Sequence, residues 1–108
     1  MDDQQFRSAS DTALENLRKA LETASEKFDF DVDSNQGALA VEFDDPPAKF
    51  VVSPNSPVRQ IWVSARVRSF KLDWNAASSR FELADGRTLM RLMADVIGEQ
   101  LGETVALD

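Results

Sequence analysis

Two stretches of the chain repeat apolar residues at spacings of three and four, the period of a helix with one buried side. The first predicts a helix from about Asp3 to Phe28, which neither proline nor glycine interrupts. The second predicts a helix over Leu89–Leu101, with Thr88 as its N-cap and Gly102 where a glycine commonly ends a helix. The apolar positions of the first helix are Phe6, Ala13, Leu14, Leu17, Leu21, Ala24 and Phe28.

Between the two helices, apolar residues alternate with polar ones in short segments, the pattern of strands with one buried face. Residues 29–37 mix acids with turn formers and are predicted to form a loop. The prolines at 46–47 and at 54 and 57 are expected to break the chain into separate strands. Short connections favour an antiparallel meander. The predicted strands are Ala38–Phe43, Lys49–Ser53, Arg59–Ala65, Ser69–Trp74 and Arg80–Ala84.

The order helix, five or six strands, helix predicts an α+β fold. We expect a two-layer sandwich in which both helices pack side by side on one face of a single antiparallel sheet. The tail Glu103–Asp108 is expected to lie back against the helices through Val105 and Leu107. We find no repeat or linker, so we expect one domain over residues 1–108. The other face of the sheet would be open to solvent and carry Gln60, Trp62, Lys71, Arg80 and Glu82.

The composition of the chain excludes several classes of protein. The chain has 108 residues, with 19 acids against 12 bases and a net charge of -7, which argues against a protein that coats nucleic acid. No apolar run approaches the roughly 18 residues of a membrane span, and the N-terminus lacks the features of a signal or transit peptide, so we expect a cytoplasmic protein. The chain has no cysteine and no histidine. This excludes disulfides, cysteine catalysis and Ser-His-Asp triads, and it means that a metal would need oxygen ligands.

The negative charge is concentrated at the start of the chain, where residues 1–45 hold 12 acids and 4 bases. On the first helix, four acids fall within an arc of roughly 60° on the side away from the apolar stripe. Carboxylates are hard donors that suit iron, manganese, calcium or magnesium, and an exposed set predicts weak, labile binding. The candidate metal ligands are Asp11, Glu15, Glu22, Glu26, Asp29, Asp31, Asp33, Glu42, Asp44 and Asp45.

The same acids allow other interpretations. Residues alone favour a solvated acidic face that binds no metal in particular. The D-x-D-x-D run at 29–33 resembles the start of an EF-hand loop, but it lacks the required glycine and has Ala40 in place of the final glutamate, which excludes that motif. Paired carboxylates could serve acid–base catalysis, but a convex helix face offers no cleft, so we expect no enzyme.

The two tryptophans differ in strand parity. Trp62 points away from Ile61 and Val63 and is therefore expected on the open sheet face, where an exposed Trp is a preferred anchor for a partner. The alternative is that neighbouring side chains shield Trp62 from water. Trp74 shares the parity of Phe70 and Leu72 and is predicted to lie in the core.

The order of elements and several motifs resemble the frataxin family. The motifs are the strand G-A-L-A-V-E-F, the run P-x-x-Q-I-W-x-S from Pro57 to Ser64, and the strand F-K-L-D-W. The closing G-E-T-V at residues 102–105 resembles the bacterial, CyaY-type members. The resemblance covers about residues 6–105. It departs from the family at residues 53–57, which read S-P-N-S-P where N-x-Q-x-P is frequent, and at Lys71, where some members carry Arg.

This resemblance implies an iron-binding accessory protein of iron–sulfur cluster assembly that holds Fe²⁺ or Fe³⁺ weakly on the acids named above, with a ferroxidase-like activity left open. It implies docking of the acidic face on a cysteine desulfurase and of the sheet face on the iron–sulfur scaffold protein. A monomer is expected, with iron-dependent oligomerisation left open. The alternative is an acidic interaction module for a basic partner, with no metal role. The candidate partner-binding residues are Gln60, Trp62, Ser64 and Lys71.

Overall fold

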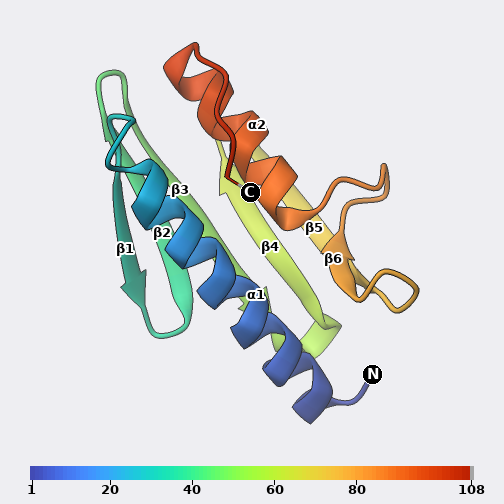
Figure 1. Ribbon diagram of the computed structural model, residues 1–108. Helices are drawn as coiled ribbons and strands as arrows, with labels where there is room; N and C mark the ends of the chain where they lie inside the picture. Colours follow the sequence, from blue (N-terminus) through green and yellow to red (C-terminus); the bar gives the residue numbers. More distant parts are fainter. Residues whose placement is uncertain (108) are drawn as a thin grey trace.

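The computed structural model describes residues 1–107 and places six strands between two helices (Figure 1). The strands form one antiparallel sheet in the order β1-β2-β3-β4-β5-β6, so each strand pairs with its neighbour in sequence. No helix in the described part is both long and apolar enough to cross a membrane. The elements are α1 (Asp3–Ala24), β1 (Asp31–Asn35), β2 (Ala38–Asp44), β3 (Pro47–Asn55), the 3₁₀ turn η1 (Ser56–Val58), β4 (Gln60–Ala65), β5 (Arg68–Asn75), β6 (Arg80–Glu82) and α2 (Leu89–Leu101).

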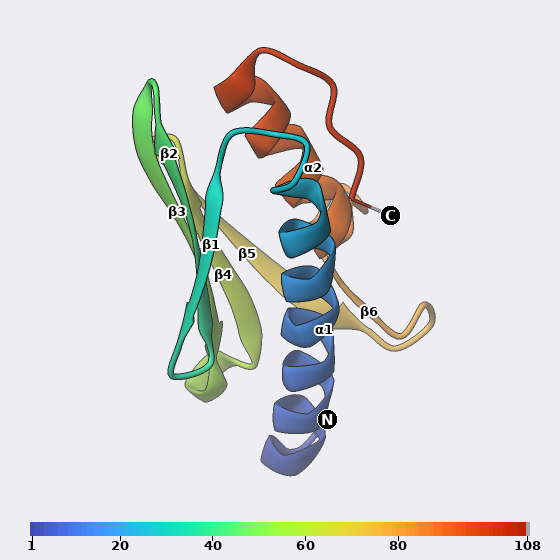
Figure 2. The same cartoon turned by 60° about the vertical axis from the view of Figure 1, so that its left-hand side comes forward.

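Both helices cover the same face of the sheet, and the other face is left to solvent (Figures 1 and 2). This arrangement confirms the predicted α+β fold with two layers. Helix α1 packs against β1 and β2, at one edge of the sheet. In the views of Figures 1 and 2, α2 lies beside it over the β4 and β5 side.

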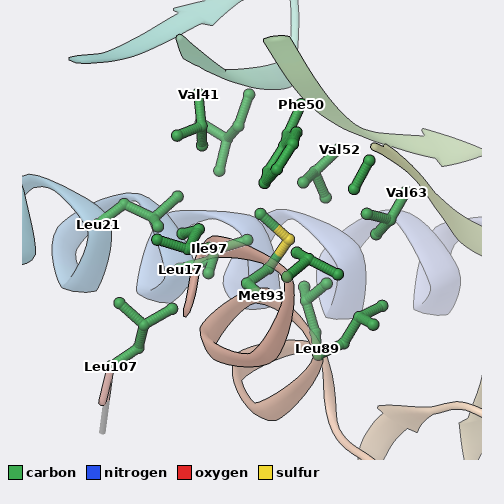
Figure 3. Packing of buried hydrophobic residues seen from close by; sticks show 14 of the residues in the cluster. Leu17, Leu21, Val41, Phe50, Val52, Val63, Leu89, Met93, Ile97 and Leu107 are labelled. Atoms are coloured by element: carbon green, nitrogen blue, oxygen red, sulfur yellow. The ribbon is translucent and has the colours of Figure 1, made fainter. Parts of the chain in front are cut away.

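The core lies between the two layers. Register aligns apolar residues across the covered face, with Leu39 opposite Val52 and Val52 opposite Val63. From the helix side, Leu17 and Met93 close over these strands, and neither is accessible to solvent (Figure 3). Burial of such side chains stabilises a fold by about 1.5–3 kcal/mol each, so strand parity is strongly fixed here.

Helix α1 begins where the sequence predicts and ends earlier. Asp2 is the N-cap and accepts from the backbone N–H of Gln5, whose side chain accepts from the N–H of Asp2 in return. The prediction that the helix reaches Phe28 is wrong, because it ends at Ala24. The hydroxyl of Ser25 donates to the carbonyl of Glu22, a local bond that competes with helical continuation. Residues 25–28 continue as turns.

The segment 29–37, predicted as a loop, contains the edge strand β1. It pairs with β2 through a two-residue turn at Gln36 and Gly37, whose φ angles are both positive, 52° and 84°. Positive φ at both positions is the geometry of a tight hairpin turn. Apart from half-buried Val32, β1 is exposed, so no alternation of apolar residues marked it as a strand. With β1, the sheet has six strands, the upper of the two predicted numbers.

Prolines interrupt the strands less than predicted. Pro47 is the first residue of β3, and Pro54 lies within it, opposite Ile61. The β2–β3 ladder ends at the pair Leu39 and Val52, so at Pro54 strand β3 has no partner on its β2 side. Proline has no N–H to donate, and on this side of the strand none is needed. The predicted turn at 54–57 is therefore reduced to η1 and to Arg59, which adopts φ 52°.

The second half of the chain follows the prediction closely. Strand β6 is shorter than predicted and ends at Glu82. Helix α2 has the predicted bounds. The hydroxyl of Thr88 accepts from the N–H of Arg91, and Gly102 ends the helix at φ 69°. Both predicted tail residues, Val105 and Leu107, are buried, which confirms that the tail packs back on the helices. Asp108, the last residue of that tail, lies outside the described residues.

The returning tail makes Gly98 structurally important. An alanine Cβ at this position would lie 2.7 Å from the carbonyl oxygen of Glu103, closer than such contacts allow. In most helices a change from glycine to alanine is favourable by about 1 kcal/mol. At Gly98 the tail must shift instead, which disturbs the burial of Val105 and Leu107.

We therefore expect Gly98→Ala to lower the free energy of unfolding by about 1–2 kcal/mol, measured by urea denaturation. In a chain that ends at Gly102 the obstructing carbonyl is absent, and the same substitution should raise stability by up to about 1 kcal/mol. Substitution effects of the same sign in the two chains would contradict the proposed contact.

Candidate functional site: an acidic ridge and an open sheet face

The ten predicted carboxylates are all exposed, and we call them the acidic ridge. Four of them come from α1 and the turn after it, and Asp29 lies in the connection to β1. The remaining five lie on β1, on β2 and in the turn to β3. Because α1 packs against β1 and β2, the elements that carry the ridge lie together at this edge of the sheet (Figure 2). The exposure of Asp11, Glu15, Glu22 and Glu26 agrees with the orientation toward solvent predicted for the acids of the first helix.

On α1, Arg18 already binds part of the ridge. Its guanidinium forms ion pairs with Glu15, three residues before it, and with Glu22, four residues after it. The Nε of Arg18 also donates to Glu15 at 3.0 Å. This hydrogen bond, followed by the positive charges of Arg18 and Lys19, holds the pKa of Glu15 below its ordinary value. A cation that binds here must compete with Arg18.

On the sheet, register brings a second group of acids together. Asp31 in β1 lies directly opposite Glu42 in β2, and Glu42 lies opposite Lys49 in β3. The Nζ of Lys49 is 3.9 Å from an Oε1 of Glu42, a long ion pair. Asp33 faces Ala40 across the same ladder, so it has no acidic partner opposite. Among the ridge acids on the sheet, the register therefore sets one pair of carboxylates directly opposite each other, Asp31 and Glu42.

The ridge is not a metal cage. Within residues 1–107, no three carboxylates come close enough together to hold a metal ion between them. Selective sites for hard cations use several oxygen ligands on one ion. The geometry is that of separate exposed carboxylates, which bind a cation weakly with water completing its shell. The ten ligand positions stay a prediction.

The open sheet face carries the four predicted partner-binding residues on β4 and β5. Trp62 is 38% exposed, which agrees with its predicted orientation. Its indole Nε1 donates to the side-chain oxygen of Gln60 at 2.9 Å, and the ammonium of Lys71 lies 4.9 Å from the centre of its ring. Ser64 is exposed two residues further along β4. Trp62 is thus both accessible and in contact with the neighbours proposed to shield it.

The sequence did not identify Asp73 as part of this group. Asp73 lies opposite Gln60 in the β4–β5 ladder, and its carboxylate accepts from the Gln60 amide at 2.9 Å. The only signal in the sequence was that Asp73 shares the parity of Lys71 and so lies on the same face of β5. Its position opposite Gln60 depends on the register between β4 and β5, which the pattern of one strand does not give.

The predicted core position of Trp74 needs correction. Trp74 is half buried, and its ring packs on Phe81 with centroids 5.1 Å apart. It borders a shallow groove of about 1220 Å³ between the first half of α1 and the start of α2. Parity placed Trp74 on the covered face correctly, but α1 and α2 do not close over this end of β5. None of the ridge residues lines the groove.

Comparison with known proteins gives one consistent result. The frataxin-like domain family matches residues 1–103. The "Iron-sulfur cluster assembly protein CyaY" of Dechloromonas aromatica (strain RCB) is 34% identical over 107 residues, 99% of each chain. The protein of the same name from Azotobacter vinelandii is 34% identical over 93 residues, which cover 83% of this chain and 84% of that protein.

A solved structure shows the same fold. The frataxin from Psychromonas ingrahamii, of the CyaY protein family, superposes with a TM-score of 0.84 and covers 100% of this chain and 99% of its own. The two sequences are 22% identical, so this likeness concerns the fold alone.

The Arg18 contacts lead to a test of the ridge electrostatics. Arg18→Gln removes the hydrogen bond and the charge that stabilise ionised Glu15, so the pKa of Glu15 should rise toward its ordinary value. Carboxyl-carbon NMR over a pH titration measures this directly. The control Lys19→Gln removes the smallest of the causes and should move the pKa of Glu15 much less. Equal shifts in the two variants would show that Arg18 is not the main partner.

Proposed function

The chain belongs to the frataxin family, and on this premise we propose that it is an accessory protein of iron–sulfur cluster assembly. The observation that carries the proposal is similarity over 99% of both chains to a protein named for that process. We propose further that it binds iron weakly through the acidic ridge and docks on the cysteine desulfurase and on its complex with the scaffold protein, in the bacterial cytoplasm.

Weak iron binding follows from the chemistry of the ridge. Carboxylate oxygens are hard donors suited to iron, and the absence of histidine and cysteine leaves oxygen as the only side-chain ligand class of note. Iron held by one or two exposed carboxylates and water exchanges readily, which suits a cargo that must be passed on. No catalytic step is assigned to the chain, because acid–base work by a pair of carboxylates needs a cleft, and none of the ridge acids lines the groove described above.

Docking is proposed through two surfaces with different physical character. The ridge presents negative charge, which complements a basic groove on the desulfurase. The open sheet face presents Trp62 with Gln60, Ser64 and Lys71, and a partly exposed Trp is a frequent anchor at interfaces. We assign this second face to the scaffold protein.

One observation favours a second candidate function, an acidic interaction module without a metal role. Arg18 occupies Glu15 and Glu22, and no three carboxylates in residues 1–107 converge. A surface of separate acids can attract a basic partner without selecting any metal. The two functions differ in whether iron binds to ridge residues in preference to calcium, which is also a hard cation.

Replacing Glu15, Glu22 and Glu26 with Gln tests the ridge. Under the proposed function this variant loses both iron affinity and desulfurase affinity in calorimetry, while its free energy of unfolding changes by less than about 1 kcal/mol because exposed pairs contribute little. NMR shift mapping with Fe²⁺ and then Ca²⁺ on the parent protein should show ridge shifts that are larger with iron.

A matched control variant removes the same number of negative charges from residues outside the ridge. Asp85→Asn, Glu99→Gln and Glu103→Gln also remove three negative charges, from positions outside the ridge. Binding losses equal to those of the ridge variant would mean that only net charge matters. Lost desulfurase binding without iron-specific shifts would favour the interaction module.

Salt dependence tests whether the ridge docks by charge. The Debye length falls from about 10 Å at 0.1 M salt to about 3 Å at 1 M. Desulfurase affinity should therefore fall steeply over that range, and the ridge variant should show a shallower slope than the parent. An affinity that hardly changes would indicate an apolar contact instead.

A further inference from the structure

Trp62 is held by two different contacts on the open sheet face. Its indole N–H donates to the side-chain oxygen of Gln60 at 2.9 Å. The ammonium of Lys71, directly opposite in the β4–β5 ladder, lies 4.9 Å from the ring centre. A side chain that is 38% exposed would ordinarily sample several rotamers. These contacts favour one of them.

The Gln60 contact depends on which way its amide faces. A glutamine side chain has one oxygen that accepts and one NH₂ that donates, and the indole N–H can only donate. If the amide turned over, its NH₂ would face the indole N–H and no bond could form. Gln60 therefore holds Trp62 in only one of its two amide orientations.

Asp73 selects that orientation. The NH₂ of Gln60 donates to the Asp73 Oδ1 at 2.9 Å, and an ionised carboxylate can only accept. The other amide orientation would set the Gln60 oxygen against the carboxylate oxygen. Asp73 and Gln60 are ladder partners, so the backbone places the two side chains next to each other.

The fold does not require this chain of contacts. Ile61 and Leu72, which alternate with these residues along β4 and β5, face the core and are fully buried. Gln60 is partly buried and Asp73 is exposed, and hydrogen bonds between such side chains add little to stability. A contact network that contributes little to the fold, yet orders a partly exposed Trp, is better suited to preparing a binding surface.

We infer that Asp73 is a positioning residue: by fixing the amide of Gln60 it holds the indole of Trp62 in one orientation before a partner docks. The binding consequence rests on the proposed function, in which Trp62 contacts the scaffold complex. The positioning itself is a property of the free protein. An anchor that is already ordered loses less conformational entropy on binding.

The free protein gives the first test, in a Trp74→Phe background so that Trp62 is the only fluorophore. Asp73→Ala should make the indole N–H of Trp62 exchange with solvent about fivefold faster, the factor that corresponds to one hydrogen bond of about 1 kcal/mol. Fluorescence anisotropy decay should show increased local motion of the ring. The unfolding midpoint should shift by no more than the loss of that one hydrogen bond accounts for.

Two further variants make the result specific. Asp73→Asn keeps a side-chain oxygen that can accept from Gln60, so it should restore most of the slow exchange. Ser69→Ala changes the same exposed face of β5 without touching the network and should have no effect. Unchanged exchange and anisotropy in Asp73→Ala, or equal effects of Ala and Asn, would overturn the inference.

Binding to the desulfurase–scaffold complex gives the second test. Asp73→Ala should weaken it by roughly fivefold, and Asp73→Asn should recover most of the loss. If the Asn variant binds as poorly as the Ala variant while its indole exchange stays slow, Asp73 acts through its charge on the partner, which overturns the positioning role in binding. If Trp62→Ala leaves binding unchanged, the proposed docking face fails, while the exchange data still decide whether Asp73 positions Trp62.

Discussion

Both helices pack on the same face of the sheet, so each strand must supply the core with one set of alternate residues and leave the other set in water. The covered face shows this in the aligned row Leu39, Val52 and Val63, all of them buried. A slip of one residue in any of these three strands would turn its apolar residues to solvent and bury residues of the open face instead, such as Glu42 or Ser64. The same constraint that fixes the core therefore fixes which residues are available for binding.

Trp62 is the clearest consequence of this constraint. Its neighbours Ile61 and Val63 cannot leave the core, so Trp62 cannot enter it. A large aromatic ring in water is unfavourable by itself, and the contacts from Gln60 and Lys71 cover only part of it. Removing Trp62 from the open face would cost nothing in the core, and on this basis we propose it as an anchor for a partner.

The sequence predicted those features whose signals are local. Helix α2 has its apolar stripe, its Thr88 cap and its closing Gly102 within a short stretch, so its bounds were predicted correctly. Strand β1 was missed because only Val32 in it is apolar, so the strand carries no alternation, and only its pairing with β2 defines it. Trp74 was placed on the correct face, but parity says nothing about how far the helices extend over it.

The features of the candidate site also differ in whether a local signal in the sequence predicts them. Exposure of the helix acids could be predicted from helical spacing, and that of Glu42 from strand parity in β2. The mutual positions of the ridge carboxylates could not, because Asp31 meets Glu42 only through the β1–β2 register, and that register depends on a strand the sequence did not reveal. Asp73 was missed for the same reason, since it meets Gln60 across the β4–β5 ladder.

The distribution of ion pairs explains how an acidic surface can bind a small cation weakly and still attract a large basic surface strongly. In the second half of the chain, arginines find acids nearby: Arg68 binds Glu99, and Arg87 and Arg91 both bind Asp95. On the ridge, only Glu15, Glu22 and Glu42 take part in ion pairs within residues 1–107.

Most ridge carboxylates therefore keep their full charge facing solvent, and their fields add over distances comparable to the Debye length. A small cation gains little from this arrangement, because it needs several oxygens within about 2–2.6 Å and finds them spread apart. A large basic surface gains much more, because it can meet many separate charges at once. The spacing that prevents a tight metal cage is the same spacing that suits the ridge to an extended partner.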